Sequence, residues 1–330
     1  MAVMLGYGAL DGVIGMRDAI GLIEQALTHE AAGNTTVSPK FVTDFTGGAM
    51  RMLFAADQQA GYCATKAYHS IQGAGTRYVV SLYRLKDGEL LALLDGQIIT
   101  DLRTGAASGV AARRVPIAGA VSVGVIGSGH QARTQLEALA AVYRVESAAV
   151  YSPTVANREK YADEMSKKLG IPVTAVATAE AAARGRAVVT SASSSRSKEP
   201  ILKGAWLSEC RLLCAVGNTR AQFAEADVQC FRDATLVVMD SAHAMEEAGE
   251  LKQAAAAGAL PEAKRATLAQ LVTGKATVPG KGLIAFKSVG TALQDLALAA
   301  RYYELLGGRA GLPAAADLGS LKKPVATRGV

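Results

Sequence analysis

The chain has 330 residues, half of them hydrophobic, which is enough for one large or two modest domains with buried cores. This apolar content excludes an intrinsically disordered chain. Aromatic residues make up only 5% whereas glycine occurs 34 times, so the apolar residues are mainly Ala, Val, Leu and Ile, as in α/β proteins. The formal net charge of +6 is far below the basic excess of a duplex-binding protein. We therefore expect no nucleic acid partner, while anionic small molecules fit this charge.

Neither a membrane span nor a signal peptide is expected. Residues 115–132 form the longest stretch without a charged residue, but four glycines and a proline interrupt it. Asp11, Arg17 and Asp18 break any apolar run near the N-terminus. The four cysteines form no C-x-x-C pair and match no histidine at metal-ligand spacing, so we expect buried free thiols and no metal site. These features predict a cytoplasmic protein.

The first third of the chain predicts a helix followed by a sheet. Ile20, Ile23 and Leu27 lie at helical spacing within residues 16–32, and Gly33 with Asn34 ends that helix. Short β-rich runs follow, with a hairpin turn at 86–88, so we expect a mostly antiparallel sheet and then a helix from near Asp101 to Arg114. The expected strands are residues 40–44, 49–54, 62–68, 76–85 and 89–94.

Beyond Pro116 the pattern changes to short apolar runs that alternate with helical stretches. Their spacing of roughly 20 to 30 residues is typical of βαβ units, so we expect a doubly wound, Rossmann-type parallel sheet. From Met245 onward we expect mainly helices, broken at 258–261 and 278–282, and a loosely held tail in the last dozen residues. The expected strands are residues 122–126, 147–151, 173–176, 187–190, 212–216 and 236–240.

A glycine loop follows the first of these strands. Residues 121–132 read VSVGVIGSGHQA, in which Gly127 permits a tight turn, Gly129 lets a pyrophosphate approach the backbone, and Ala132 allows close helix packing. The phosphate would meet the helix N-terminus, so Ser128, His130 and Gln131 also become candidate cofactor contacts, His130 through its backbone N–H. The strand before the loop and the helix after it favour a dinucleotide site over a glycine-rich packing turn.

The residues after the second strand bear on the choice of cofactor. An NAD site normally carries an acid about 20 residues beyond the glycine loop, but here the strand ends in Tyr151-Ser-Pro-Thr154. Ser152, Thr154 and Arg158 are suited to donate hydrogen bonds to a 2′-phosphate. We therefore favour NADP(H) over NAD(H), the alternative being that Arg158 belongs to a solvated helix start.

Three further segments carry a family resemblance. Residues 94–108 follow the pattern DG-x-x-x-T-x-x-RT-x-A-A-S, Ala49-Met-Arg51 precedes Cys63-Ala-Thr-Lys66, and Phe286-Lys-Ser-Val-Gly290 precedes Gln294-Asp-Leu296. With the glycine loop and residues 248–251, these segments resemble the ornithine cyclodeaminase and mu-crystallin family of nicotinamide-dependent proteins over roughly residues 5–305.

The resemblance implies an architecture and an assembly. It implies an α+β substrate-binding and dimerisation domain (residues 1–115 with about 295–330), a Rossmann domain (116–294), C-terminal helices that join the two, and a homodimer built through the N-terminal sheets. It also adds candidate cofactor contacts at motif positions and strand ends, namely Thr104, Ser191, Ala192, Val216, Gly217, Ser288 and Gly290.

The basic motif residues point to a substrate with an α-carboxylate. Arg51 and Arg103 are suited to hold it, because a guanidinium is permanently charged and binds a carboxylate through two hydrogen bonds. If Lys66 is desolvated beside these arginines, its pKa falls and it can exchange a proton with the substrate nitrogen. If each of these residues is considered alone, the alternative to a role in substrate binding is an exposed position or an ion pair within the protein.

The chain departs from the cyclodeaminases after Gly217. Those enzymes place an aspartate one or two residues on, where this chain has Asn218 and Thr219, neither of which can act as a base. Arg220 also places positive charge where the second ammonium of a diamine would lie. The stretch is more similar to the ketimine-reductase branch, with Asn218 as a polar group at the nicotinamide or substrate.

The resemblance therefore implies hydride transfer from NAD(P)H to a 2-imino acid, giving an L-amino acid. The first choice of substrate is a cyclic ketimine of the Δ1-pyrroline-2-carboxylate or Δ1-piperideine-2-carboxylate type. An L-amino-acid dehydrogenase, an ornithine cyclodeaminase and a ligand-binding protein without turnover remain open as alternatives.

Overall fold

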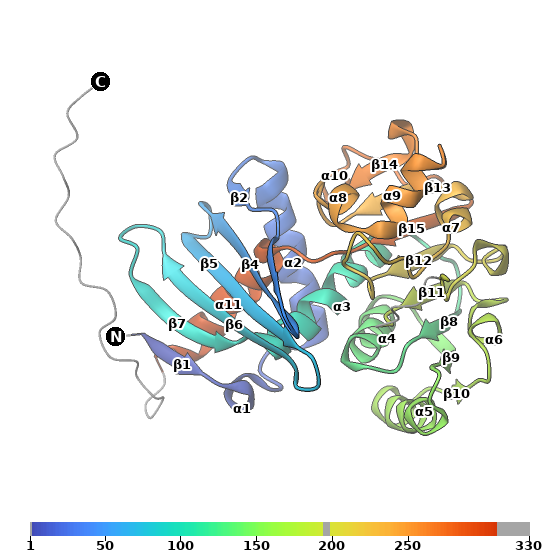
Figure 1. Cartoon of the computed structure of the whole chain (residues 1–330), viewed down its shortest axis with the longest axis horizontal. Helices are drawn as coiled ribbons and strands as arrows, with labels where there is room; N and C mark the ends of the chain where they lie inside the picture. The colour runs from blue at the N-terminus through green and yellow to red at the C-terminus, as the bar shows by residue number, and fades with distance from the viewer. Residues whose placement is uncertain (1, 194–198, 309–330) are drawn as a thin grey trace.

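The computed structural model describes residues 2–193 and 199–308, and its strands form two separate sheets (Figure 1). The first sheet has the order β1-β7-β6-β5-β4-β2, with β3 added beside β4. Its neighbours pair antiparallel except β1, which pairs parallel with β7. The strands are β1 (Val3–Leu5), β2 (Thr35–Val37), β3 (Phe41–Phe45), β4 (Gly48–Asp57), β5 (Tyr62–Ile71), β6 (Gly75–Arg84) and β7 (Leu90–Asp95).

The expected antiparallel sheet is confirmed, and two of its strands were missed. Both β1 and β2 span three residues, which is too short for an alternating pattern to show in the sequence. The expected N-terminal helix is α2 (Met16–Ala31), which buries Ile20, Ile23 and Leu27. The helix expected from Asp101 begins earlier, as α3 (Gly96–Arg114), because the Asp95 side chain caps it by accepting a hydrogen bond from Gln97 N.

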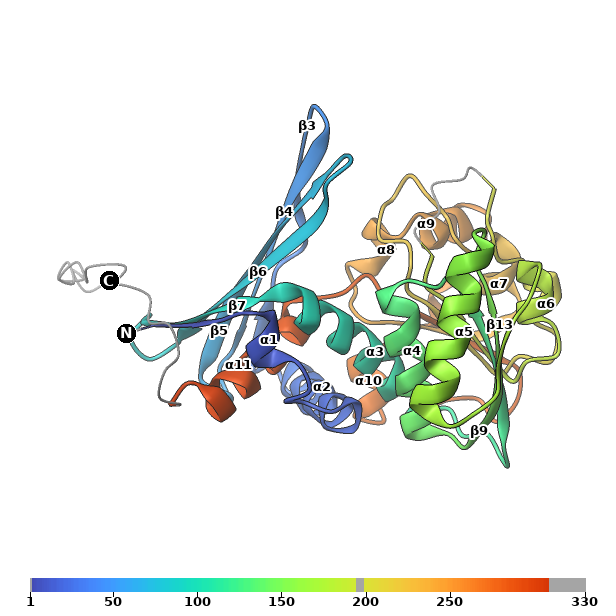
Figure 2. The ribbon, with the colours of Figure 1, turned by 90° about the horizontal axis from the view of Figure 1, so that it is seen from below.

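Helices cover one face of this sheet and leave the other bare. Figure 2 shows α2, α3 and α11 (Ala292–Leu306) on one side, while no helix of the described chain covers the opposite side. Strand β4 reflects this asymmetry: Leu53 and Ala55 are buried against the helices, whereas Met52 and Phe54 are exposed. The helix-covered side is called the inner face below, and the bare side the outer face.

The second sheet is parallel throughout, with the order β10-β9-β8-β11-β12-β15-β13-β14. This confirms the doubly wound fold. Strand β8 has β9 on one side and β11 on the other, so the strand order reverses at β8, where such sheets bind ligands. The strands are β8 (Val121–Ile126), β9 (Val145–Tyr151), β10 (Val173–Ala175), β11 (Val188–Ser191), β12 (Leu212–Ala215), β13 (Ala234–Met239), β14 (Arg265–Thr267) and β15 (Leu283–Lys287).

Helices predominate after Met245 in the described residues, as expected, but the strands β14 and β15 in that region were missed. Strand β15 is fully buried and pairs with both β12 and β13 near the centre of the sheet. A five-residue apolar run is equally compatible with a buried strand and a buried helical turn, so its pattern did not separate the two. The helices of this half are α4 (His130–Val142), α5 (Val155–Leu169), α6 (Ala179–Ala183), α7 (Val228–Arg232), α8 (Ala244–Glu247), α9 (Gly249–Ala256) and α10 (Leu268–Val272).

Helix α11 brings the chain back from the second sheet to the first. It packs against β4, β5, α2 and α3, with Leu293, Leu296 and Ala299 buried. This return places residues near 295 beside β4 and β5, which lie more than 200 positions earlier in the sequence. The tail expected in the last dozen residues lies outside the described residues.

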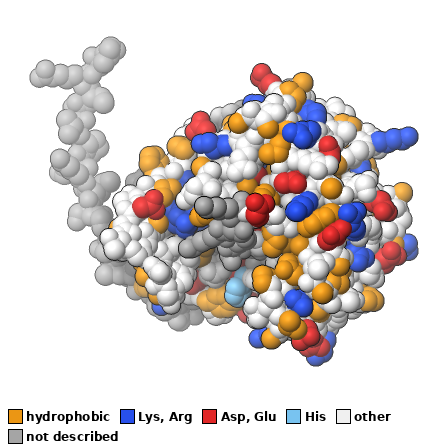
Figure 3. All heavy atoms as spheres, turned by 45° about the vertical axis from the view of Figure 1, so that its right-hand side comes forward, with side chains coloured by type: hydrophobic (Ala, Val, Ile, Leu, Met, Phe, Trp, Pro, Cys, Tyr) orange, Lys and Arg blue, Asp and Glu red, His pale blue; other side chains and the backbone are white. Residues whose placement is uncertain are grey.

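Membrane-spanning segments, cysteines and surface charge were also addressed by the sequence. Within the described residues no helix is long and apolar enough to cross a membrane. Three of the four cysteines are buried, Cys63 is partly buried, and all four are free. On the face shown in Figure 3, Lys and Arg side chains are interspersed with Asp and Glu and form no continuous basic patch.

Candidate active site

The inner face of the first sheet brings the predicted basic residues together. Arg51 lies directly across from Tyr68 in the β4–β5 ladder, and Tyr68 lies across from Tyr78 in the β5–β6 ladder. Lys66 is two residues from Tyr68 and therefore points to the same face. The two tyrosine rings stack with centroids 5.0 Å apart, and the Arg51 guanidinium lies 5.6 Å from the Tyr68 ring. The sheet thus presents two cations on an aromatic floor.

Lys66 is buried, with 2% of its surface exposed. Its ammonium donates to Asp295 Oδ1 at 2.7 Å and to Thr100 Oγ1 at 2.6 Å, and it lies 5.2 Å from the Tyr78 ring. Burial, helped by the nearby positive charge of Arg103 and opposed by Asp295, lowers the pKa of Lys66 to about 8. This confirms the expected direction and makes Lys66 able to gain or lose a proton near neutral pH.

Arg103 comes from helix α3 and is held by helix α11. Its Nη1 donates to Gln294 Oε1 at 3.2 Å, and its Nε lies 3.4 Å from Asp295 Oδ1. Gly290 packs directly on the guanidinium with a φ of +80°, so any side chain at that position would overlap Arg103. Asp295 therefore contacts both Lys66 and Arg103 and sets their relative position.

The turn that carries Ser288 and Gly290 is fixed by Asp240, at the end of β13. The buried Asp240 carboxylate accepts hydrogen bonds from Ser288 Oγ at 2.6 Å and from Gly290 N at 2.7 Å. Both residues were predicted to contact the cofactor, and both line the same cavity as Lys66. The hydrogen-bonding groups named here are directed at Asp240, so any contact with a cofactor would use other atoms of this turn.

One cavity of about 210 Å³ collects these groups from both sheets. Arg51, Lys66 and Arg103 line it together with the predicted cofactor positions Thr104, Gln131, Val216, Gly217, Ser288 and Gly290. Lys40, before β3, also lines it and crosses to the other half of the molecule: its ammonium donates to Glu247 Oε2 at 2.7 Å and to Val289 O at 3.3 Å. Contacts between the two halves of the molecule therefore form part of the wall of this cavity.

Asn218 lies at this cavity's edge with its side chain directed into its own loop. Its amide donates to Arg220 O at 3.2 Å, to Phe223 O, and to Glu250 Oε2 at 2.9 Å. The expected contact with nicotinamide or substrate stays a prediction. What the geometry provides is a rigid loop from Gly217 to Phe223, which will be called the 217–223 loop.

The glycine loop has the geometry that a pyrophosphate requires. Gly127 adopts a φ of +114° and packs on Ala192 O, Gly129 caps the N-terminus of α4 with open space where a Cβ would lie, and Ala132 is fully buried. A dinucleotide phosphate thus fits against the α4 N-terminus. The His130 ring is 80% exposed, and the Gln131 amide donates to Asp101 Oδ1 at 2.6 Å, which joins α3 to the loop.

The ends of β11 and β12 lie beside the glycine loop. Val216 N donates to Ser191 O at 2.8 Å. The buried Glu225 carboxylate accepts from Ser193 N at 2.6 Å and from Gly217 N at 3.0 Å, which ties the two strand ends together. The predicted cofactor residues Ser191, Ala192, Val216 and Gly217 are therefore neighbours at the carboxyl edge of the sheet.

Two of the residues proposed for the 2′-phosphate, Ser152 and Arg158, meet beside Ser128 of the glycine loop. Ser128 Oγ donates to Ser152 Oγ at 2.9 Å, and Arg158 Nη1 donates to Ser152 O at 2.9 Å. Thr154 is the N-cap of α5 and is exposed, with no side-chain capping bond. A cluster of hydroxyls and one guanidinium stands at the end of β9, where an NAD site would carry an acid.

Comparisons with known proteins agree with this arrangement. Residues 3–309 match the Ornithine cyclodeaminase/mu-crystallin family. The chain belongs to this family. An alanine dehydrogenase from Archaeoglobus fulgidus is 30% identical over 311 residues, covering 92% of this chain and 94% of the relative.

Solved structures of similar proteins extend the match to the fold. A Δ1-pyrroline-2-carboxylate reductase from Thermococcus litoralis, in complex with NADH and L-proline, superposes with a TM-score of 0.86 at 30% identity, covering 92% of this chain and 96% of that one. An archaeal alanine dehydrogenase dimer with bound NAD gives a TM-score of 0.84 at 26% identity, covering 92% and 95%. The expected enzyme class, an NAD(P)-dependent oxidoreductase, is confirmed.

Sequence reasoning missed several members of the site. Asp295 and Gln294 stood in a motif that was noted but received no role, and Thr100 is the threonine of the T-x-x-RT pattern. A carboxylate among so many basic motif residues was a usable signal, since a buried ammonium needs a partner. Tyr78 and Lys40 carried no signal, because only the strand register and the contact between the sheets bring them to the cavity.

We expect Lys66 to titrate near pH 8. In protein labelled at the lysine ε-carbon, NMR should show one ε-carbon resonance, that of Lys66, with a midpoint near 8. Asp295→Asn removes the charge that opposes the effect of burial, so the pKa of Lys66 should fall further.

The matched control is Asp101→Asn, a buried carboxylate near the cavity whose hydrogen bonds go to Gln97 and Gln131 instead of Lys66. It should move the Lys66 midpoint much less. A midpoint near 10 in the unmodified protein, or equal shifts in both variants, would contradict this assignment.

Proposed function

We propose that this protein reduces a 2-imino acid to an L-amino acid with a reduced nicotinamide dinucleotide. One observation carries the proposal: the proton-exchanging Lys66 and the arginines Arg51 and Arg103 line the same cavity as the residues expected to contact the cofactor. In this proposal residues 1–115, with about 295–330, bind the substrate, and residues 116–294 bind the cofactor.

The chemistry requires three functions from the protein. Arg51 and Arg103 bind the α-carboxylate and thereby orient the C=N bond. Lys66 donates a proton to the imine nitrogen, so that one hydride and one proton convert C=N into CH–NH. A bound dihydronicotinamide supplies the hydride. Asp295 and Thr100 hold the Lys66 ammonium in place, and the rings of Tyr68 and Tyr78 exclude water from it.

Cyclic imines of the pyrroline or piperideine type are the first substrates to test, and the similarity to the reductase crystallised with NADH and L-proline supports this choice. A second candidate is an L-amino-acid dehydrogenase acting on an acyclic substrate, which the equally extensive similarity to alanine dehydrogenase favours. The absence of an acid at Asn218 and Thr219 speaks against the cyclodeaminase alternative.

Turnover is tested by following NADPH and NADH oxidation with Δ1-pyrroline-2-carboxylate, with Δ1-piperideine-2-carboxylate, and with pyruvate plus ammonia. We expect reduction of at least one imine, with a rate that falls as the pH rises through about 8, since only protonated Lys66 can donate. The reverse reaction needs neutral Lys66, so its rate should rise over the same range.

Lys66→Ala should abolish reduction while cofactor binding, followed by quenching of protein fluorescence, stays unchanged. Full activity in that variant would remove Lys66 from the mechanism. Ammonia release from ornithine would favour the cyclodeaminase, and cofactor binding without turnover of any substrate would favour a ligand-binding protein.

NADP(H) is the cofactor we favour within this class. The support is the cluster of Ser128, Ser152 and Arg158 at the end of β9, which offers donors to a 2′-phosphate and no carboxylate to a ribose diol. The similar alanine dehydrogenase structure contains NAD, so the choice depends on these residues of the chain itself.

Arg158→Gln should raise KM for NADPH about 10-fold and leave KM for NADH unchanged, because one charge-assisted contact to the phosphate is lost. Lys160→Gln, an exposed cation on the same helix, serves as the control and should change neither value. Equal KM changes for both cofactors in Arg158→Gln would contradict the NADP(H) proposal.

A homodimer through the outer face of the first sheet completes the proposal. Phe41, Met52 and Phe54 are exposed there, and the rings of Phe41 and Phe54 pack 5.4 Å apart. Figure 2 shows that no described helix covers this face. An exposed apolar sheet face of this kind is typical of an interface, and the similar alanine dehydrogenase is a dimer.

Sedimentation velocity at micromolar concentration should give a dimer for the natural chain and a monomer for Phe54→Glu, which puts a charge into the apolar face. Val155→Glu places the same charge on α5, where Val155 is 50% exposed, and should stay dimeric. A monomeric natural chain, or dissociation of both variants, would argue against this interface.

A further inference from the structure

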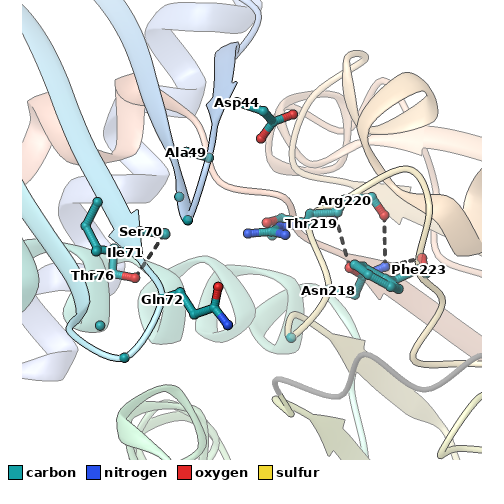
Figure 4. Close-up of a pocket in the computed structure, with 15 residues that line it drawn as sticks. Asp44, Ala49, Ser70, Ile71, Gln72, Thr76, Asn218, Thr219, Arg220 and Phe223 are labelled. Carbon is teal, nitrogen blue, oxygen red and sulfur yellow. Dashed lines mark hydrogen bonds between the residues drawn. The ribbon is translucent and has the colours of Figure 1, made fainter.

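A second, larger cavity continues outward from the one that holds Lys66. It measures about 740 Å³ and shares Ser70, Gly217, Thr219 and Arg220 with the inner cavity. Figure 4 shows it between the tips of the first sheet and the 217–223 loop, with Gln72 and Thr76 on the sheet side and Thr219 and Arg220 on the loop side. Its walls carry hydroxyls, the amides of Gln72 and Asn218, the guanidinium of Arg220 and the carboxylate of Asp44.

The described residues that line the two connected cavities carry more positive than negative charge. Lys40, Lys66, Arg51, Arg103 and Arg220 line the inner cavity, and Asp295 is the one acid among its lining residues. Lys66 is paired with Asp295, and Lys40 with Glu247. Arg51 and Arg103 are sufficient for one α-carboxylate, and Arg220 lines both cavities as a further guanidinium.

Arg220 is held where it can act on a second group of the substrate. Two hydrogen bonds between Asn218 and Arg220 stabilise the 217–223 loop. Arg220 N donates to Asn218 Oδ1 at 3.1 Å, and Asn218 Nδ2 donates to Arg220 O at 3.2 Å. Beneath the loop, the fully buried Lys287 lies 2.8 Å from Glu250 and donates to Asn218 O. These contacts fix the backbone from which the Arg220 side chain extends, at the junction of the two cavities. Figure 4 shows this side chain directed towards the first sheet.

We propose that Arg220 determines substrate specificity by binding a second acidic group, so that the preferred substrates are 2-imino diacids. The inference rests on the proposed function, because the α-imino carboxylate is held by Arg51, Arg103 and Lys66 as described above. It narrows the substrate class. A cyclic imine without a second polar group would leave the outer cavity empty. A substrate whose side-chain carboxylate reaches Arg220 would gain a charge-assisted hydrogen bond.

The outer cavity also carries one acid, Asp44, on β3. Figure 4 shows it on the side of the pocket away from Gln72 and Thr76. A diamine would have to place its second ammonium beside Arg220, which repels it, whereas a second carboxylate meets attraction there. The location of Arg220 at the shared wall therefore favours acids over amines.

The test compares imines with and without a second acidic group. Purified protein receives NADPH, ammonia and, separately, oxaloacetate, 2-oxoglutarate or pyruvate, with Δ1-pyrroline-2-carboxylate as the cyclic comparison. We expect the highest kcat/KM with one of the two diacids. Arg220→Gln should lower kcat/KM for that diacid about 10- to 100-fold and leave the pyruvate reaction within about 3-fold, since only the second carboxylate loses its partner.

Two further variants keep the result interpretable. Arg220→Lys retains the charge but not the planar pair of donors and should recover part of the diacid activity. Arg184→Gln removes an exposed arginine remote from both cavities and should change nothing. Circular dichroism melting curves identify any variant that loses activity through unfolding.

The outcomes separate the two proposals. Higher kcat/KM for pyruvate plus ammonia or for the cyclic imine than for either diacid, or an Arg220→Gln loss that is equal for all substrates, would overturn the inference and leave imine reduction standing. No turnover with any imine would overturn the proposed function and the inference together.

Discussion

The buried ion pair between Lys66 and Asp295 is the interaction on which the rest of the site depends. Removing two charges from water costs on the order of several kcal/mol per ion, so the pair is stable only with close geometry and further partners. Thr100 and Arg103 provide these partners. Because Lys66 belongs to β5 and Asp295 to α11, the site is complete only after the chain has formed the second sheet and returned. Packing of helix α11 against the first sheet therefore completes the surroundings of Lys66.

Other buried charges extend this principle to the loops. Asp240 gathers the donors of the turn at 288–290, and Lys287 with Glu250 supports the 217–223 loop. Each of these groups replaces water with fixed hydrogen bonds, which makes the loops at the carboxyl edge of the parallel sheet rigid. Rigid loops suit the proposed reaction, in which a hydride donor and a proton donor approach the same C=N bond from different sheets.

Where the sequence predicted well, the responsible signal was local. The glycine loop was readable because strand, turn and helix follow one another along the chain, and Gly127 adopts the positive φ that only glycine tolerates there at low cost. Strand β15 was missed because its five apolar residues have no period that distinguishes strand from helix. The expectation that Asn218 contacts the nicotinamide or the substrate stays a prediction. The direction of its side chain could not be known from the sequence, because Glu250 and the backbone carbonyls of the 217–223 loop hold its amide.

By itself, the sequence determined the doubly wound sheet, the glycine loop, the family and the basic residues Arg51, Lys66 and Arg103, because each depends on a short pattern of neighbouring residues. The tertiary structure alone decided that these cations share one cavity, that Asp295 tunes Lys66, and that Arg220 faces an outward extension of the same space. The reason is physical: burial, opposing charge and cavity shape arise between residues more than 200 positions apart, and no local pattern records which of them meet.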